Sequence, residues 1–166
     1  VFSIPKATAT IASKLKDAAL IKKSKVYPYQ ILCAYLMAEN NIPDSVKEAL
    51  QTALEISLKN VPKFYGNVIV CPDVSGSMSS PITGYRKGAS TSVRCIDVAA
   101  LISAAIMRKQ PKARIMPFEC NVVKLDLNPQ SSVMTNAQKL AKIGGGGTNC
   151  SAPLKALADE GAKVDM

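Results

Sequence analysis

The chain has 166 residues, with 21 Lys and Arg against 12 Asp and Glu, and its formal net charge is +9 at pH 7. An apolar share of 48% over this length supports a hydrophobic core and excludes a disordered chain. The positive charge favours polyanions such as nucleic acid or an anionic membrane surface, and it does not choose between them. No apolar run approaches the roughly 20 residues of a membrane span, so we expect a soluble chain without a membrane partner.

Cysteine usage limits the chemistry that the chain can perform. The five cysteines are scattered, mostly inside apolar segments, and the chain has no histidine. This pattern is typical of small buried residues in a reducing compartment, so we expect a cytoplasmic protein. The absence of histidine and of any CxxC pair argues strongly against a structural zinc site, and it leaves no Ser-His-Asp or Cys-His nucleophile.

The first part of the chain is predicted to be helical. Over 8–24, apolar residues recur at helical spacing and indicate one amphipathic helix that ends in a basic cluster of Lys22, Lys23 and Lys25. The simplest interpretation of the cluster is a solvated face near a helix C-terminus, where cations are mildly stabilising. The alternative is a surface that contacts phosphates.

Two more helices are expected before residue 60. The second, over 30–38 after Pro28, is apolar on most faces and should be buried between neighbours. Tyrosines in and before it could stack on bases, although a core position is the simpler interpretation. The third opens with a capping box of Ser45 and Glu48 and runs to about residue 59. Such a series is typical of the last part of a helical array, and we place the domain boundary near residue 66.

A short apolar run over 68–71, rich in β-branched residues, predicts a buried parallel strand. It is followed by Asp73, Ser75 and Ser77, which are hard oxygen donors of the kind that suits Mg²⁺, Mn²⁺ or Ca²⁺. Ligands bind beyond the carboxyl ends of strands in open α/β sheets, so a metal site is one interpretation. The other is a Ser/Gly turn in which Asp73 caps local amides.

The middle of the chain is predicted to alternate between helices and strands. A long polar loop over 79–91 carries Arg86 and Lys87, which could shape or guard the site or could simply be solvated. A helix over 92–109 follows, in which we expect Asp97 to be a surface carboxylate. Two strands over 112–118 and 121–125 are so close in sequence that they must pair antiparallel. A helix over 131–142 comes next.

Four glycines over 144–147 precede Thr148 and a last helix over 152–160. The glycines could bring the backbone close to a crowded site or end a helix flexibly, and without a following Lys they do not form a P-loop. The hydroxyl of Thr148 could meet those of the earlier motif over the sheet edge. Residues 162–166 begin another strand without a continuation, so we infer a fragment of a longer product or a sheet completed by a second chain.

The combination of Asp73, Ser75 and Ser77 with Thr148 resembles the metal-ion-dependent adhesion site of von Willebrand factor type A domains. More narrowly, the segment 23–32 and the segment 145–154 resemble the Ro autoantigen, or TROVE-domain, family of RNA-binding proteins. The resemblance implies an α/β fold, in which residues 1–65 end a HEAT-like helical ring. Residues 66–166 would then form the incomplete first part of a Rossmann-like type A domain.

The resemblance also implies a function. Ro-like proteins bind small noncoding Y-type RNAs and misfolded RNAs in RNA quality control, as ribonucleoproteins without an established catalytic activity, so we predict a non-enzyme. Asp73, Ser75, Ser77 and Thr148 would hold Mg²⁺ or another divalent cation, leaving an open position for an acidic partner. The further acidic ligand of such sites is expected beyond Met166, because Asp165 comes too early in its strand.

Three functions are compatible with these features. The first is Ro-like RNA binding through the helical part and the basic charge, for which Lys22, Lys23, Lys25, Arg86 and Lys87 are the candidate contacts. The alternative is a type A interaction module that grips an acidic protein partner through the metal, without RNA. A phosphoryl-transfer enzyme built on Asp73 is disfavoured, because the aspartyl-phosphate families carry a second Asp where this chain has Ser75.

Overall fold

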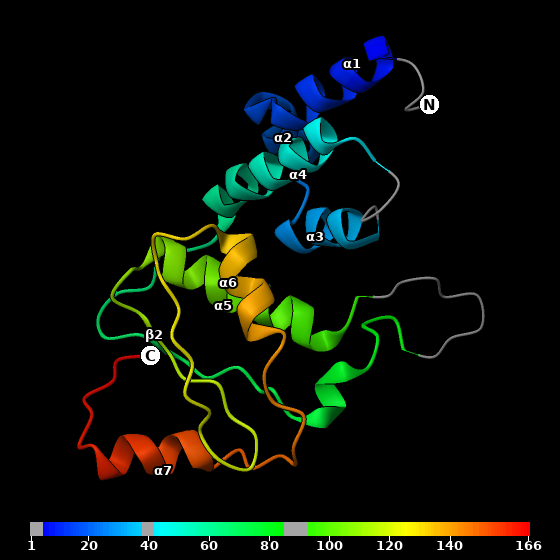
Figure 1. Cartoon of the computed structure of the whole chain (residues 1–166). Coiled ribbons are helices and arrows are strands. Elements are labelled where there is room, and N and C mark those ends of the chain that lie inside the picture. The colour runs from blue at the N-terminus through cyan, green and yellow to red at the C-terminus, as the bar shows by residue number, and fades with distance from the viewer. Residues whose placement is uncertain (1–4, 38–41, 85–92) are drawn as a thin grey trace. The chain divides into compact units, whose positions relative to one another are not determined.

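The computed structural model describes residues 5–37, 42–84 and 93–166, which divide into two compact units (Figure 1). The first unit runs to Val61, and the second begins at Pro62. Within the described ranges, no helix is both long and apolar enough to cross a bilayer.

The first unit is entirely helical in its described part. Its elements are α1 (Pro5–Lys16), α2 (Ala18–Ser24), α3 (Pro28–Met37), α4 (Asp44–Ser57) and the 3₁₀ turn η1 (Leu58–Asn60). α4 contributes most of its core, since one face of this helix is buried along its whole length. The buried apolar residues of α4 are Val46, Ala49, Leu50, Ala53 and Leu54.

The single helix predicted over 8–24 is wrong, because the chain breaks at Asp17. This residue has an extended backbone, and its carboxylate accepts the N–H groups of Ala19 at 2.8 Å and Leu20 at 3.1 Å. Asp17 therefore caps the N-terminus of a new helix, which the uninterrupted apolar spacing did not reveal. The capping box predicted at Ser45 is also wrong, since the N-cap of α4 is Pro43 and no side chain caps that end.

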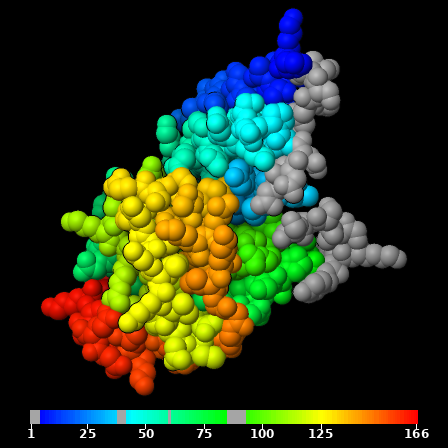
Figure 2. Space-filling view, viewed as in Figure 1, coloured from blue at the N-terminus to red at the C-terminus, as the bar shows by residue number. Residues whose placement is uncertain are grey.

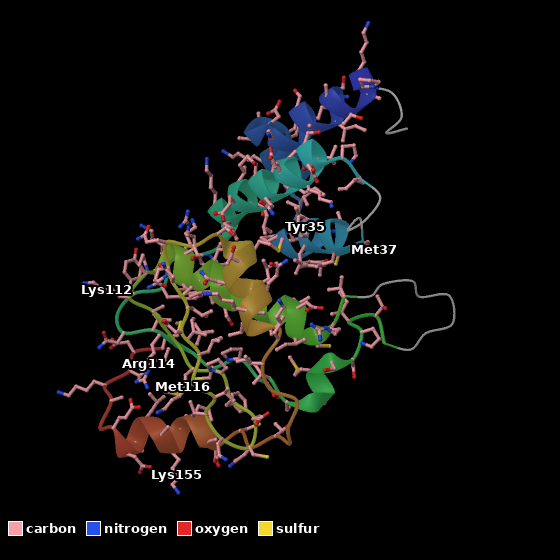
Figure 3. All side chains as sticks on the ribbon, viewed as in Figure 1. Tyr35, Met37, Lys112, Arg114, Met116 and Lys155 are labelled. Atoms are coloured by element: carbon pink, nitrogen blue, oxygen red, sulfur yellow. The ribbon has the colours of Figure 1, made fainter. Side chains whose placement is uncertain are left out.

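The burial predicted for the second helix holds for one face only. Ile31 and Leu32 of α3 are buried, whereas Tyr29 is 41% and Met37 is 55% exposed. Tyr35 and Met37 project from α3 in Figure 3. An apolar composition indicates that a helix can be buried, but neighbours on each side decide whether it is.

The second unit is an α/β arrangement. Its elements are β1 (Ile69–Val70), the 3₁₀ turn η2 (Gly76–Ser79), α5 (Cys95–Lys109), β2 (Arg114–Ile115), α6 (Val133–Leu140) and α7 (Ala152–Asp159). In Figure 1, α5 and α6 lie on one side of the strands and α7 lies on the other. Figure 2 shows α6 beside the loop that precedes it, and the buried Asn136 donates from its side chain to the carbonyl of Asn128 at 2.8 Å.

β1 and β2 pair in parallel, with Ile69 opposite Arg114 and Val70 opposite Ile115. Of the two antiparallel strands predicted over 112–125, only β2 forms, together with one antiparallel bridge between Phe118 and Val122. Pro117 accepts the N–H of Val123 at 2.8 Å but has no N–H to donate in return, so the antiparallel ladder lacks a hydrogen bond at this position.

The C-terminal residues lie against the free side of β1. The N–H of Ile69 donates to the carbonyl of Met166 at 2.8 Å, and the N–H of Met166 donates back to Asn67 at 3.4 Å. This alternation is that of parallel pairing, but residues 162–166 do not form the strand predicted for them. The Asp165 carboxylate accepts the N–H of Asn67 at 2.7 Å, so it lies at the end of β1 opposite to Asp73.

Asp97 is a structural residue rather than the predicted surface carboxylate. It accepts the Arg94 N–H at 2.8 Å and pairs with the Arg94 guanidinium at 2.7 Å, and its side chain is 11% exposed. The same guanidinium donates to the carbonyl of Ala141 at 3.2 Å. The pair therefore caps α5 and ties it to the end of α6.

Candidate metal site and basic surface

The motif that follows β1 is held at the carboxyl edge of the two strands. Asp73 bridges Phe118 in parallel, and the N–H of Val74 donates to the Phe118 carbonyl at 2.8 Å. One carboxylate oxygen of Asp73 accepts the N–H of Ser75 at 2.8 Å. Asp73 thus caps a local amide, as the turn interpretation expected, and its second oxygen has no hydrogen bond among the described contacts.

The two serine hydroxyls of the motif converge. The Oγ atoms of Ser75 and Ser77 share a hydrogen bond at 3.2 Å, with Ser75 buried and Ser77 exposed. In an octahedral Mg²⁺ shell, ligands at about 2.1 Å lie about 3 Å from their neighbours, so this separation matches one edge of such a shell. In the described part of the chain, no three Cys, Asp or Glu side chains gather as a metal-ligand group. A metal at this edge would therefore depend on the hydroxyls.

The glycine-rich loop packs directly on this motif. The N–H of Gly145 donates to the Val74 carbonyl at 2.9 Å, and the N–H of Gly76 donates to the Gly146 carbonyl at 2.8 Å. These two hydrogen bonds flank Ser75, so the loop that carries Thr148 lies beside the serine motif. Of the two roles open to the glycines, the structure shows the close approach to a crowded site.

Close packing explains why glycine is needed here. A Cβ on Gly76 would lie 2.9 Å from the Gly145 carbonyl oxygen. Gly144 has a φ of +87°, and a Cβ there would overlap with the Val74 carbonyl oxygen. Larger residues at these two positions would push the loops apart.

Thr148 is exposed, and its position depends on a residue that the sequence did not single out. The carboxylate of Glu119 accepts the N–H of Gly146 at 2.8 Å, and its main-chain carbonyl accepts the N–H of Asn149 at 2.8 Å. Both sides of Thr148 are therefore bound to Glu119. The sequence offered one sign of this role. Glu119 directly follows the predicted strand over 112–118, which would place it at the same sheet edge as Asp73.

The predicted basic cluster lies in the first unit. Lys22, Lys23 and Lys25 are exposed, and Lys25 ends α2 in a left-handed conformation with φ of 50°. Tyr27 and Tyr29 follow directly and stack on each other, with ring centroids 6.2 Å apart and planes 18° apart. The other two candidate RNA contacts, Arg86 and Lys87, lie outside the described residues.

An open groove of about 540 Å³ lies beside this cluster within the first unit. Its walls are mainly apolar and include Leu15, Ile21 and Ile31, and Lys14 and Lys23 also line it. The unit thus combines cationic side chains with an apolar depression.

Comparison with known proteins identifies a family and a relative that this chain resembles. Residues 67–166 match the sequence family described as "Ro60 vWA domain". A curated relative, "RNA-binding protein RO60" of Deinococcus radiodurans, is 26% identical over 175 residues, which cover 97% of this chain and 32% of the relative. The chain thus spans about a third of the length of that relative.

A solved structure, described as the crystal structure of the Deinococcus radiodurans Ro (RSR) protein, has the same fold. The TM-score is 0.75 at 24% identity, over 99% of this chain and 34% of that one. The predicted fold class, helices followed by a von Willebrand factor type A domain, is thereby confirmed. Because the matched residues make up more than half of the sequence, the chain belongs to the Ro family, and residues 67–166 are its von Willebrand factor type A domain.

Proposed function

We propose that this chain belongs to a Ro-type RNA-binding protein that binds small noncoding, Y-type RNAs and misfolded RNAs in cytoplasmic RNA quality control. The name of the Deinococcus relative supports RNA as the partner. The observation that carries the proposal for this chain is the surface formed by the end of α2 and the start of α3. It presents adjacent cations and aromatic rings to solvent.

The chemistry of that surface suits single-stranded RNA. Lys22, Lys23 and Lys25 are exposed and can neutralise phosphates. Tyr27 is 63% and Tyr29 is 41% exposed, so the stacked pair could receive an unpaired base on its outer face. The apolar sequence around these tyrosines predicted core positions for them. Their exposure instead favours the alternative, in which they stack on bases.

A substitution series in the full-length protein tests the proposal. The probe is a structured RNA with a free single-stranded end, titrated at several salt concentrations. Replacing Lys22, Lys23 and Lys25 with Gln should lower the slope of log K against log salt by about 2, since each phosphate contact to a single strand contributes about 0.7.

The matched control replaces three exposed lysines of the second unit, Lys124, Lys139 and Lys142, with Gln. It changes the net charge by the same amount and should leave most of the affinity and slope. If both triple variants lost affinity and salt slope equally, RNA binding would depend on the general charge of the protein and not on a localised surface at Lys22, Lys23 and Lys25. No RNA binding by the parent at low salt would refute RNA as the partner.

The type A unit supports a second proposal, in which Asp73, Ser75, Ser77 and Thr148 hold Mg²⁺ or Mn²⁺. Its support is the 3.2 Å separation of the two serine hydroxyls beside the half-buried Asp73 carboxylate. A bound divalent cation would supply a positive centre for an acidic side chain of a protein partner. This is the adhesion-type role, and it does not require RNA.

Metal binding is tested by thermal unfolding of the full-length protein with and without Mg²⁺ or Mn²⁺. A ligand that binds the native state raises the melting temperature with concentration, and Asp73→Ala should abolish that rise. Lys124→Gln, on the same unit, serves as the control that keeps it. An Asp73→Ala protein that responds like the parent would show that the metal binds elsewhere.

A further inference from the structure

The side chain of Glu119 lies at the sheet edge beside the candidate metal site, where it binds the glycine-rich loop. Resting on the proposed metal site, we infer that Glu119 is the positioning residue that holds the Thr148 loop against the serine motif. It follows β2 and belongs neither to the serine motif nor to the glycine loop, so it can join the two from outside.

The first step is the pair of hydrogen bonds that Glu119 makes around Thr148. Its carboxylate accepts from Gly146, two residues before Thr148, and its carbonyl accepts from Asn149, one residue after, both at 2.8 Å. Hydrogen bonds to a charged acceptor are about twice as strong as those between neutral groups. Thr148 is thereby held at both sides, although it is itself exposed.

The second step connects Thr148 with the serine hydroxyls. The peptide group of Gly146 donates its N–H to Glu119, and the Gly146 carbonyl accepts the N–H of Gly76 at 2.8 Å. Gly76 lies between Ser75 and Ser77. Gly146 therefore links the Glu119 carboxylate to the backbone of the serine motif.

The third step is steric. A Cβ on Gly146 would lie 2.8 Å from the Glu119 carboxylate, so the carboxylate fills the space that a side chain at residue 146 would need. Glycine and glutamate are thus matched at this contact. The main chain that follows β2 adds rigidity, because Phe118 before Glu119 donates its N–H to the carbonyl of Pro72 at 3.0 Å and accepts the N–H of Val74 at 2.8 Å.

Two readouts in the full-length protein test this role. The first is amide hydrogen exchange of the peptide 144–150 without metal. Glu119→Ala should accelerate exchange at Gly146 about ten-fold, the effect of losing one hydrogen bond to a charged acceptor. Glu119→Gln keeps an acceptor oxygen at the same reach and should stay within about three-fold of the parent. Asp126→Ala, which removes an exposed carboxylate of the same unit, should change nothing.

The second readout is the rise in melting temperature with Mg²⁺ or Mn²⁺. Glu119→Ala should lose most of that rise, and Glu119→Gln should retain it, because positioning requires an acceptor and not a charge. If both variants lost the metal-dependent rise in melting temperature, the charge of Glu119 would matter and the positioning role would be overturned. Parent-like loop exchange in Glu119→Ala would refute the inference whatever the metal does. If the parent shows no metal response but the exchange pattern holds, the metal proposal fails and the positioning role stands.

Discussion

Replacing Gly144 with alanine should destabilise the second unit more than any change at an open glycine. Gly144 begins the loop that packs on Val74, and its φ of +87° lies in the left-handed region. A Cβ there would overlap with the carbonyl oxygen of Val74 and come within 2.8 Å of the Val74 Cβ. Neither obstacle is the flexible end of a side chain, so the backbone itself must shift.

The magnitude has two parts. The left-handed backbone costs a non-glycine residue about 1 kcal/mol. Forcing a methyl group into a packed contact typically costs a further 1–3 kcal/mol or so. The expected loss in the free energy of unfolding is therefore about 2–4 kcal/mol. The same shift would separate Gly145 from the Val74 carbonyl and so displace the loop that carries Thr148.

Gly161→Ala is the matched control. Gly161 has a φ of +60°, and nothing lies within 4 Å of its added Cβ, so it isolates the backbone contribution of about 1 kcal/mol. Urea denaturation of the two variants and the parent, with the slope checked for constancy, measures both losses. If Gly144→Ala were no more destabilising than Gly161→Ala, the packing of the glycine loop on Val74 would be refuted.

Three further predictions address other parts of the fold. Leu54→Ala, at a site 1% exposed in α4, should lower the free energy of unfolding of the first unit by about 2–5 kcal/mol in urea titrations, and a loss below 1 kcal/mol would contradict its core position. Arg114, which donates to Glu160 at 2.8 Å, lowers the pKa of that carboxyl below 4.5, so the stabilisation by this pair is present above pH 4.5 and is lost as pH falls through the lowered pKa. An NMR titration should show this low pKa in the parent and its return in Arg114→Gln; an unchanged value would contradict the pairing. Burial raises the pKa of the Cys71 thiol, so iodoacetamide at pH 8 should modify Cys71 more slowly than the exposed Cys120, with the difference vanishing in urea.

Local patterns predicted β1 and the three helices of the second unit well. The β-branched run before Asp73 forms β1, and the helices predicted over 92–109, 131–142 and 152–160 appear as α5, α6 and α7 with ends shifted by a few residues. These elements could be predicted because the periodicity of a strand or a helix depends only on residues that are close together in the sequence. The sheet edge that gathers the carboxyl ends of β1 and β2 follows from parallel pairing, and it brings the serine motif and the glycine loop together.

Local patterns failed where a single side chain or a missing neighbour decides the outcome. The apolar spacing over 8–24 continues across Asp17, and only the hydrogen bonds of its carboxylate to Ala19 and Leu20 show that one helix ends and another begins. In α3, composition predicted burial on most faces, but Tyr29 and Met37 are exposed. Spacing reports which residues share a face, and it does not report what covers that face.

The candidate metal site shows the same limit in another form. Oxygen donors at alternate positions could be recognised from residue type, because metal preference is a property of the side chain. The hydrogen bonds by which Glu119 holds the Thr148 loop could not be recognised in this way. Their donors are the peptide N–H groups of Gly146 and Asn149, and every residue type except proline offers such a group. A carboxylate that binds backbone N–H groups leaves no spacing rule in the sequence. Glu119 therefore had to be found from the structure, in which its carboxylate and carbonyl bind peptide groups on either side of Thr148.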